Sequence, residues 1–419
     1  MKQHTLEFAL DADKKDELAY LRNEFIFPKG DGNEPWLYFT GNSLGLQPKS
    51  ASKAVQGIMD DWANLAVEGH FLGDNPWTKY NEQLTDKMAK VVGAKPIEVV
   101  ISNTLTTNLH LLMVSFYQPT KKRFKIVIES DAFPSDRYAV ESQLKFHGFD
   151  PKEGLVEWSP KPGNDLLDYE DLQKILDEQG DEIALLLIGG VNYYTGQFFD
   201  FKRLAQMGHH AGAIVGIDLA HGAGNIQPKL HESGVDFASW CTYKYMNSGP
   251  GSLSGIFVHE KHAHNRELPR FAGWWNHNAS TRFNMRLDFD VIPGAEGWQL
   301  SNHPILSMAP IKASLELFEK VGMDKLRSKS LKLTAYLESL ILNLDSNRIK
   351  IITPKNPEER GCQLSLQVQD ANRSLHDALI ARGVITDWRE PDVIRVAPTP
   401  MYNSYEDVYR FVEILKKLM

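Results

Sequence analysis

The chain has 419 residues, of which 42% are hydrophobic and 24% are charged, as is usual for a globular protein with a large buried core. Its length predicts two or three domains. The formal net charge of −8 and the lack of a basic block argue against nucleic acid as a main partner.

Cysteine content and apolar runs indicate the compartment. Only Cys241 and Cys362 occur, so we expect a reducing environment and no disulfide framework. The first 15 residues lack the apolar core and the cleavage pattern of a signal peptide. The longest apolar run, 183–190, is far shorter than the roughly 20 residues of a membrane helix. We therefore expect a soluble, cytoplasmic protein with no membrane partner.

The N-terminal part predicts mostly helices. Helices are expected at 13–25, 48–68 and 76–92, the last two with apolar residues at the three-to-four spacing of an amphipathic helix. Gly93 directly follows the third helix, where a left-handed residue commonly ends one. Residues 36–40 (WLYFT) are expected to form an extended strand leading into GNSLGLQP.

From residue 99 onward, apolar strands alternate with amphipathic helices. The expected strands lie at 99–102, 125–130, 183–190 and 213–220, and the expected helices at 103–117, 133–148, 168–180 and 200–212. Such alternation is typical of a mostly parallel sheet with helices on both faces, an α/β fold. In these sheets ligands bind at the carboxyl ends of the strands.

After about residue 305 the pattern changes to long helices followed by short strands. Helices are expected at 305–322, 326–344, 374–382 and 405–418, and strands at 350–353, 362–368 and 393–398. This mixture predicts a smaller α+β domain. We therefore divide the chain into an N-terminal arm (1–50), a large α/β domain (51–305) and a small C-terminal α+β domain (306–419).

An acid and a lysine end two successive apolar runs in the large domain. Asp218 lies near the end of AIVGIDLA, and Lys244 ends VDFASWCTYK 26 residues later. A lysine can form a Schiff base with an aldehyde, and an aspartate can keep a pyridine nitrogen protonated, so that the ring accepts electrons. The pair indicates a pyridoxal-phosphate site, although each residue alone could be a helix cap or a surface charge.

Two strand-to-helix junctions add groups suited to that cofactor. Residues 103–107 (NTLTT) combine hydroxyls with a helix N-terminus, which would bind a phosphate or simply cap the helix. At the second junction Phe133 could stack on a flat ring and Asp136 could hold a ring substituent. Their plain alternatives are a core aromatic and a charge that favours the helix dipole.

Two single residues and one loop could also belong to an active site. Tyr243 could bind a phosphate or donate a proton, but strand alternation turns it away from Lys244 unless the strand ends there. Arg395 could hold a carboxylate with its planar fork. The irregular loop 273–283 (GWWNHNASTRF) crowds aromatic, amide and cationic groups, as loops at active sites or subunit contacts often do.

Other motifs have weaker support. GNSLG (41–45) fits the nucleophile elbow of a serine hydrolase with Ser43 as nucleophile, but it precedes any buried central strand. The histidines at 209, 210, 262 and 264 have no carboxylate or cysteine partner at ligand spacing, so we expect solvated surface and no metal site. Cys241 is expected to be a buried strand residue.

The chain resembles the kynureninases, fold-type-I pyridoxal-phosphate enzymes. The resemblance extends from LYFTGNSLGLQP to VIRVAPTPMYNS and includes TTNLHLLMVSFY, AFPSDRYA, YYTGQ, GIDLAHGAGN, GVDFASWCTYKY, STRF and SNHPIL. It implies a homodimer that uses pyridoxal phosphate to hydrolyse the Cβ–Cγ bond of kynurenine or 3-hydroxykynurenine, in tryptophan degradation or NAD biosynthesis.

The resemblance also implies roles for particular residues. Lys244 would bind the cofactor covalently and, with Tyr243, move protons. The remaining cofactor contacts would come from Leu105, Thr106, Phe133, Asp136, Asp218, His221, Trp274 and Asn302, and the substrate contacts from Ser43, His70 and Arg395. One departure is Gly189, where some relatives have a serine near the cofactor, so that contact would be absent or replaced by water.

Alternatives within the same fold remain open. An aminotransferase or a cysteine desulfurase would keep Lys244 and Asp218 but change the substrate pocket. A desulfurase needs a reactive cysteine in a mobile loop, and Cys362 is the candidate for it. Because His70 and Asn302 are polar groups expected near the substrate ring, we predict a preference for 3-hydroxykynurenine.

Overall fold

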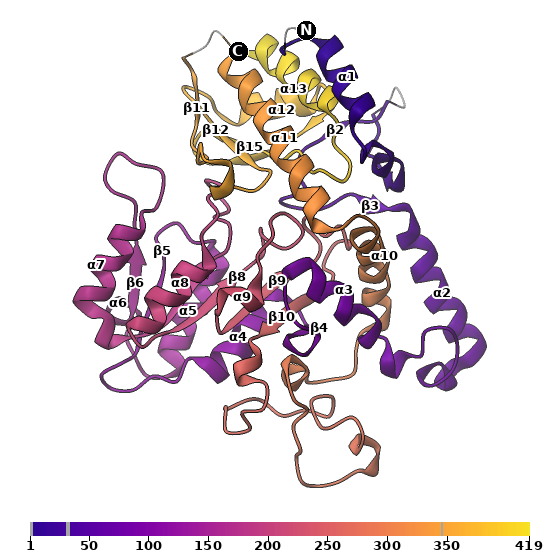
Figure 1. Cartoon of the computed structure of the whole chain (residues 1–419), viewed down its shortest axis with the longest axis vertical. Helices are drawn as coiled ribbons and strands as arrows, with labels where there is room; N and C mark the ends of the chain where they lie inside the picture. Colours follow the sequence, from indigo (N-terminus) through magenta and orange to yellow (C-terminus); the bar gives the residue numbers. More distant parts are fainter. Residues whose placement is uncertain (1–2, 31–33, 345–346) are drawn as a thin grey trace.

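The computed structural model describes residues 3–30, 34–344 and 347–419, and it places them in two bodies, each built around a sheet (Figure 1). The larger sheet has seven strands in the order β4-β10-β9-β8-β7-β5-β6. These strands are β4 (Val99–Ser102), β5 (Lys125–Glu129), β6 (Leu155–Trp158), β7 (Ile183–Gly189), β8 (Ile214–Asp218), β9 (Phe237–Cys241) and β10 (Ser254–Val258). Strands β5 to β9 pair in parallel, whereas β10 is antiparallel to both β4 and β9. The predicted mostly parallel sheet is confirmed.

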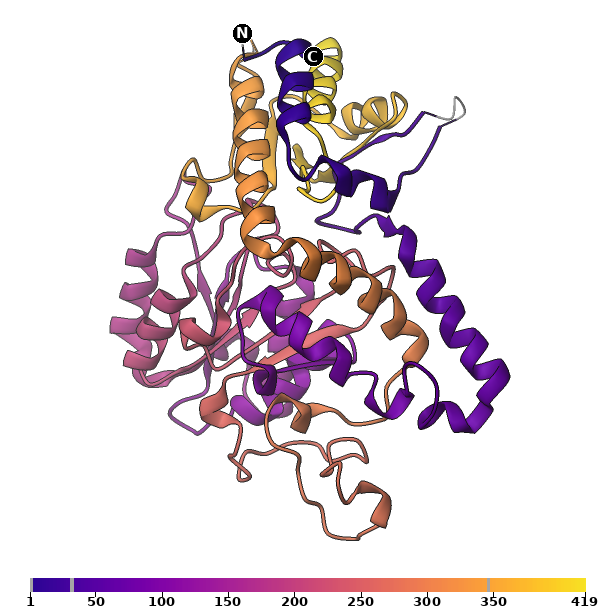
Figure 2. The ribbon, with the colours of Figure 1, turned by 45° about the vertical axis from the view of Figure 1, so that its right-hand side comes forward.

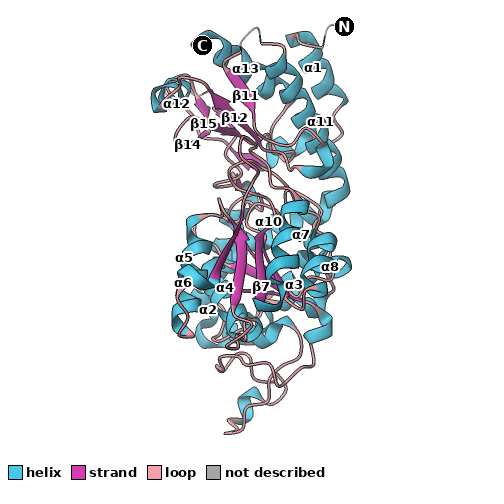
Figure 3. Ribbon diagram, turned by 90° about the vertical axis from the view of Figure 1, so that its left-hand side faces the viewer, coloured by secondary structure: helices cyan, strands magenta, loops and turns pink. Residues whose placement is uncertain are grey.

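Helices cover both faces of this sheet. In Figure 3 the helices α4 and α5 lie on one face, and α7 and α8 lie on the other. The helices of this body are α2 (Lys49–Leu65), α3 (Glu82–Val92), α4 (Leu105–Phe116), α5 (Pro134–Phe146), α6 (Pro151–Gly154), α7 (Tyr169–Gln179), α8 (Phe201–His210) and α9 (Leu230–Ser233). Buried apolar residues fill both helix–sheet interfaces, so the strands are apolar on both sides.

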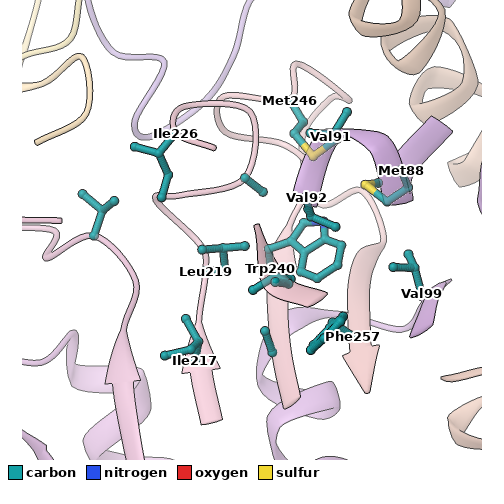
Figure 4. Packing of buried hydrophobic residues seen from close by; sticks show 14 of the residues in the cluster. Met88, Val91, Val92, Val99, Ile217, Leu219, Ile226, Trp240, Met246 and Phe257 are labelled. Atoms are coloured by element: carbon teal, nitrogen blue, oxygen red, sulfur yellow. The ribbon is translucent and has the colours of Figure 1, made fainter. Parts of the chain in front are cut away.

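A buried tryptophan anchors the strand that leads to Lys244. Trp240 on β9 has no exposed surface, and Figure 4 shows its ring among Val92, Leu219 and Phe257. Gly255 on the neighbouring strand leaves room for this ring, since a Cβ there would lie 2.2 Å from it. Dense packing of this kind fixes where β9 ends.

The smaller body has an antiparallel sheet in the order β11-β12-β15-β14. Its strands are β11 (Ile349–Ile351), β12 (Leu364–Val368), β14 (Asp387–Arg389) and β15 (Val393–Val396), and its helices are α11 (Met323–Leu342), α12 (Arg373–Ile380) and α13 (Tyr405–Leu418). Helix α10 (Ile305–Val321) packs on α2 and leads into α11 (Figure 2). The predicted α+β region after residue 305 is confirmed, while the exact domain boundaries stay a prediction.

The N-terminal segment joins the two bodies. Helix α1 (Leu6–Lys15) packs on α13, and β2 (Leu37–Tyr38) pairs in parallel with β13 (Val384–Ile385) of the small body. The short strands β1 (Phe25–Ile26) and β3 (Gln47–Pro48) then pair with each other.

Three local predictions were wrong. The helix expected at 13–25 is instead α1 followed by a 3-10 turn at Ala19–Glu24, because Thr5 caps an earlier start by accepting the Phe8 N–H at 3.3 Å. The helix expected from residue 76 begins at Glu82, after a separate 3-10 turn. Strand β6 was missed, since its half-exposed edge position gives a weak apolar pattern. Within the described ranges, no helix is long and apolar enough to span a membrane.

Candidate active site

A pocket of about 360 Å³ lies at the carboxyl ends of the strands of the large sheet, below the small body. Ten of the site residues predicted from the sequence line it: Ser43, Leu105, Thr106, Phe133, Asp136, Asp218, His221, Tyr243, Lys244 and Arg395. They come from segments spread over more than 350 positions of the chain. The structure therefore brings together most of the predicted site.

Lys244 contacts a neutral histidine. Its Nζ atom lies 3.0 Å from Nε2 of His221, which is buried. Burial and the nearby charge of Lys244 lower the pKa of His221 well below its usual value. Nε2 therefore accepts a hydrogen bond from the ammonium group, and the proton of the ring lies on Nδ1, which has no partner among the described residues.

Tyr243 also faces the pocket. Strand β9 ends at Cys241, so Tyr243 and Lys244 belong to the turn that follows, and strand alternation no longer separates them. The Lys244 ammonium lies 6.0 Å from the centre of the Tyr243 ring. Burial raises the pKa of the Tyr243 phenol, so this group is protonated and able to donate.

Two carboxyl groups line the same pocket as the lysine. Asp218 ends β8, and its Oδ1 accepts the Ala220 N–H at 2.8 Å. Asp136 lies in the first turn of α5 and is also buried. Burial raises the pKa of both acids, and the neighbouring Asp218 raises that of Asp136 further, so Asp136 holds a proton more readily and Asp218 the charge.

Sequence reasoning missed a third acid, Glu129, at the end of β5. Burial raises its pKa to about 7. Its Oε2 accepts the Gly189 N–H at 2.9 Å, and a Cβ on Gly189 would lie 2.8 Å from its Oε1. Glu129 thus occupies the space that a side chain at position 189 would need. An acid at the end of a buried strand was the available signal, the same one that indicated Asp218.

The start of α4 offers free donors to the pocket. Thr104 is the N-cap but makes no side-chain cap, so the first backbone N–H groups of the helix are available. The hydroxyl oxygen of Thr106 lies 2.9 Å from that of Ser135. Hydroxyls and helix-terminal N–H groups together suit a phosphate.

These groups fit pyridoxal phosphate. Lys244 is a suitable partner for its aldehyde, Asp218 for its ring nitrogen and the start of α4 for its phosphate. The unpartnered Nδ1–H of His221 is a buried donor that a bound polar group would satisfy. Phe133, with 44% of its surface exposed, is free to stack on the ring.

Arg395 is buried but fully paired. Its Nε and Nη2 lie 3.0 and 2.8 Å from the carboxylate of Asp387, and its Nη1 donates to the Tyr193 carbonyl at 2.7 Å. Asp387 and a second arginine, Arg389, were not identified from the sequence, because nothing local indicates that they pair.

The GNSLG turn packs against the lysine segment. The Gly45 N–H donates to the Tyr243 carbonyl at 2.8 Å, and a Cβ on Gly45 would lie 2.4 Å from the Lys244 carbonyl oxygen. This close approach requires glycine and places Ser43 at the pocket. Since no histidine bonds to the Ser43 hydroxyl in the described part of the chain, the nucleophile-elbow alternative loses its support.

His70, Trp274 and Asn302 do not line this pocket. His70 and Trp274 belong to one aromatic cluster. Measured between ring centres, Phe71 lies 5.9 Å and Trp274 lies 5.4 Å from Phe283 in this cluster. The loop that carries Trp274 lies at the end of the molecule opposite the small body (Figures 1 and 2). Asn302 is exposed. One chain alone therefore does not bring these residues to Lys244.

His209, His210 and His264 are exposed, as expected, whereas His262 is half-buried. His209 and His262 lie 2.8 and 2.9 Å from the buried carboxylate of Asp236. These contacts are made between segments distant in sequence, so ligand spacing could not reveal them. A separate cluster, Glu98 with His231 and His259, has metal-ligand spacing, but the carboxylate already accepts three protein N–H groups.

Known proteins are similar to this chain over nearly its whole length. A profile of the kynureninase C-terminal domain matches residues 326–415, and one of serine hydroxymethyltransferase matches residues 155–349. The kynureninase of Flavobacterium psychrophilum is 56% identical over 99% of this chain and 98% of its own length. The chain belongs to the kynureninase family. The kynureninase of Myxococcus xanthus is 52% identical over 98% of this chain and 96% of its own length.

Solved structures support the same fold. A cysteine desulfurase of Thermococcus onnurineus superimposes with a TM-score of 0.73 at 18% identity, over 98% of this chain and 97% of its own. One of Escherichia coli gives 0.75 at 16%, over 96% and 98%. At such identities the likeness concerns the fold alone. Cys362, the candidate desulfurase nucleophile, is fully buried, and burial raises its pKa to about 12, so it is not reactive.

Proposed function

We propose that this member of the kynureninase family hydrolyses the Cβ–Cγ bond of kynurenine or 3-hydroxykynurenine, releasing an anthranilate and alanine. The observation that carries the proposal is that Lys244 and Asp218 both line one pocket of a chain 56% identical to a kynureninase. When bound, pyridoxal phosphate supplies an electron-accepting ring next to the substrate Cα.

The residues around Lys244 divide the remaining work. Asp218, as the charged acid of its pair, keeps the ring nitrogen protonated, and protonated Asp136 donates a hydrogen bond beside it. Lys244 holds the cofactor and then moves protons at the substrate carbons. Neutral His221 accepts from the lysine without adding a competing positive charge.

The phosphate and the substrate occupy opposite ends of the pocket in this proposal. The phosphate is bound by the N–H groups of Leu105 and Thr106 and by the Tyr243 phenol, which also donates a proton to the leaving carbon. Arg395 receives the substrate carboxylate, and Ser43 contacts the substrate from the N-terminal turn.

We also propose a homodimer in which each pocket is completed by the partner subunit. His70, Trp274 and Asn302 would then reach the partner's cofactor and substrate. The segment around them carries a broad apolar surface, with 57% of Phe71, 53% of Leu72, 51% of Phe283 and 74% of Met285 exposed. Exposed apolar surface of this extent is typical of subunit contacts.

Product analysis tests the activity. The purified protein loaded with pyridoxal phosphate is mixed with each of the two kynurenines, and we expect the matching anthranilate and one equivalent of alanine. Pyruvate and ammonia, or a transaminated keto acid, would contradict the proposal and favour another fold-type-I activity. The proposed setting is cytoplasmic tryptophan degradation or NAD biosynthesis.

A further inference from the structure

Asp387 binds two arginines at once. On β14 and β15, its carboxylate lies 3.0 and 2.8 Å from Nε and Nη2 of Arg395. It also lies 2.9 and 3.2 Å from Nε and Nη2 of Arg389. One negative charge between two positive ones leaves the cluster with a net charge of about +1, and both arginines line the pocket.

The two guanidinium groups differ in how many of their nitrogens already contact the protein. Arg395 is 1% exposed and uses all three of its nitrogens in protein contacts. Arg389 has 33% of its side chain exposed, and in the described chain no bond is made by its Nη1. Arg389 therefore has the more accessible donors, although only Arg395 was identified from the sequence.

An aromatic wall connects both arginines with the proposed stacking position of the cofactor. Arg389 and Arg395 lie 5.8 and 5.9 Å from the centre of the Tyr193 ring. That ring contacts Phe133 edge to face at 5.3 Å, and Phe133 is the proposed stacking partner of the cofactor. The charges of both arginines also help to lower the pKa of His221, which contacts Lys244.

We propose that Arg389 is a second substrate-binding cation, which receives the carboxylate of the amino acid together with Arg395. Asp387 neutralises one guanidinium charge, so a carboxylate needs the second one as its counter-ion. The Nη1 edge of Arg389 is available for the planar, charge-assisted bonds that carboxylates form with arginine. This inference rests on the proposed function, since it concerns the substrate of that site.

The test compares two ligands that differ only in the carboxylate. The protein loaded with pyridoxal phosphate is titrated with L-alanine and with L-alaninamide, and binding is followed by the visible absorption of the cofactor. Arg389→Gln should weaken L-alanine binding about 10- to 100-fold and leave L-alaninamide binding within about twofold. Arg389→Lys, which keeps the charge but loses the fork, should fall between the parent and Arg389→Gln.

The matched control is Arg382→Gln, because Arg382 is an exposed arginine of the same body, and among the described residues its side chain bonds only to the Ala378 carbonyl. It should leave both affinities unchanged. Equal losses for both ligands in Arg389→Gln, no loss for either, or a parent protein that does not respond to L-alanine would each overturn the proposal. Binding does not require turnover, so this result is independent of whether kynurenine is hydrolysed.

Discussion

The Nζ atom of Lys244 lies 3.0 Å from Nε2 of His221, and the two residues are separated by 23 positions in the chain. The histidine is held neutral by burial, so it accepts from the lysine and does not repel it. When the lysine nitrogen is bound to the cofactor, this acceptor remains beside it. The contact thus fixes the position of the lysine amine in the pocket that Asp136 and Asp218 also line.

Lys244 is expected to be the site of covalent cofactor binding. The purified protein should absorb in the visible range with pyridoxal phosphate, and borohydride should fix the cofactor on the peptide that contains Lys244. Lys244→Ala should abolish the label, whereas the exposed Lys202→Ala should retain it. A labelled peptide elsewhere, or a protein that never gains the absorption band, would contradict the assignment.

Asp218→Asn is expected to lower kcat by at least about 100-fold and cofactor affinity much less, since the ring nitrogen loses its counter-charge while the phosphate contacts remain. Asp136→Asn is the matched control. Because Asp136 already carries a proton, Asp136→Asn should lower kcat far less than Asp218→Asn does. The prediction fails if the two variants lose activity equally.

Arg395→Lys is expected to raise KM for kynurenine by about tenfold or more, because an ammonium group cannot both keep the two-point pairing with Asp387 and receive the substrate carboxylate. The thermal midpoint should also fall, since a buried ion pair is disturbed. Steady-state kinetics and a melting curve measure both effects. An unchanged KM would mean that another cation, such as Arg389, receives the carboxylate alone.

Shared active sites predict complementation between inactive variants. Lys244→Ala and Trp274→Ala homodimers should each be inactive, and subunit exchange should produce mixed dimers with one intact site. After equimolar mixing about half of the dimers should be mixed, and each mixed dimer has one of its two sites intact. Mixing should therefore restore up to about a quarter of the parent activity. Absence of recovery, with exchange demonstrated by a labelled subunit, would place both residues in the site of one chain.

The substrate ring is expected to prefer a 3-hydroxyl group. His70 and Asn302 are polar, and plain kynurenine would leave them partly unpaired at a cost of about 1–3 kcal/mol. That cost corresponds to a roughly 5- to 100-fold higher kcat/KM for 3-hydroxykynurenine. The ratio of kcat/KM for 3-hydroxykynurenine to that for kynurenine should fall strongly in His70→Phe. A parent enzyme that favours kynurenine, or a ratio unmoved by the substitution, would show that these residues do not recognise the hydroxyl.

The sequence by itself determined the alternation of strands and helices, the two-body architecture and the candidates Asp218 and Lys244. These depend on local patterns, since an apolar run predicts a buried strand and a polar residue at its end predicts a position at the edge of the sheet. Glu129 followed the same rule and could have been found by it. The long strings shared with kynureninases identified most of the remaining pocket residues.

Only the tertiary structure decided how those residues meet. It ended β9 at Cys241, which turned Tyr243 into the pocket, and it paired Arg395 with Asp387 and His209 with Asp236. It also placed Trp274 away from Lys244 within one chain. Such contacts join side chains distant along the chain, and their geometry depends on strand ends, turns and packing that no local pattern encodes.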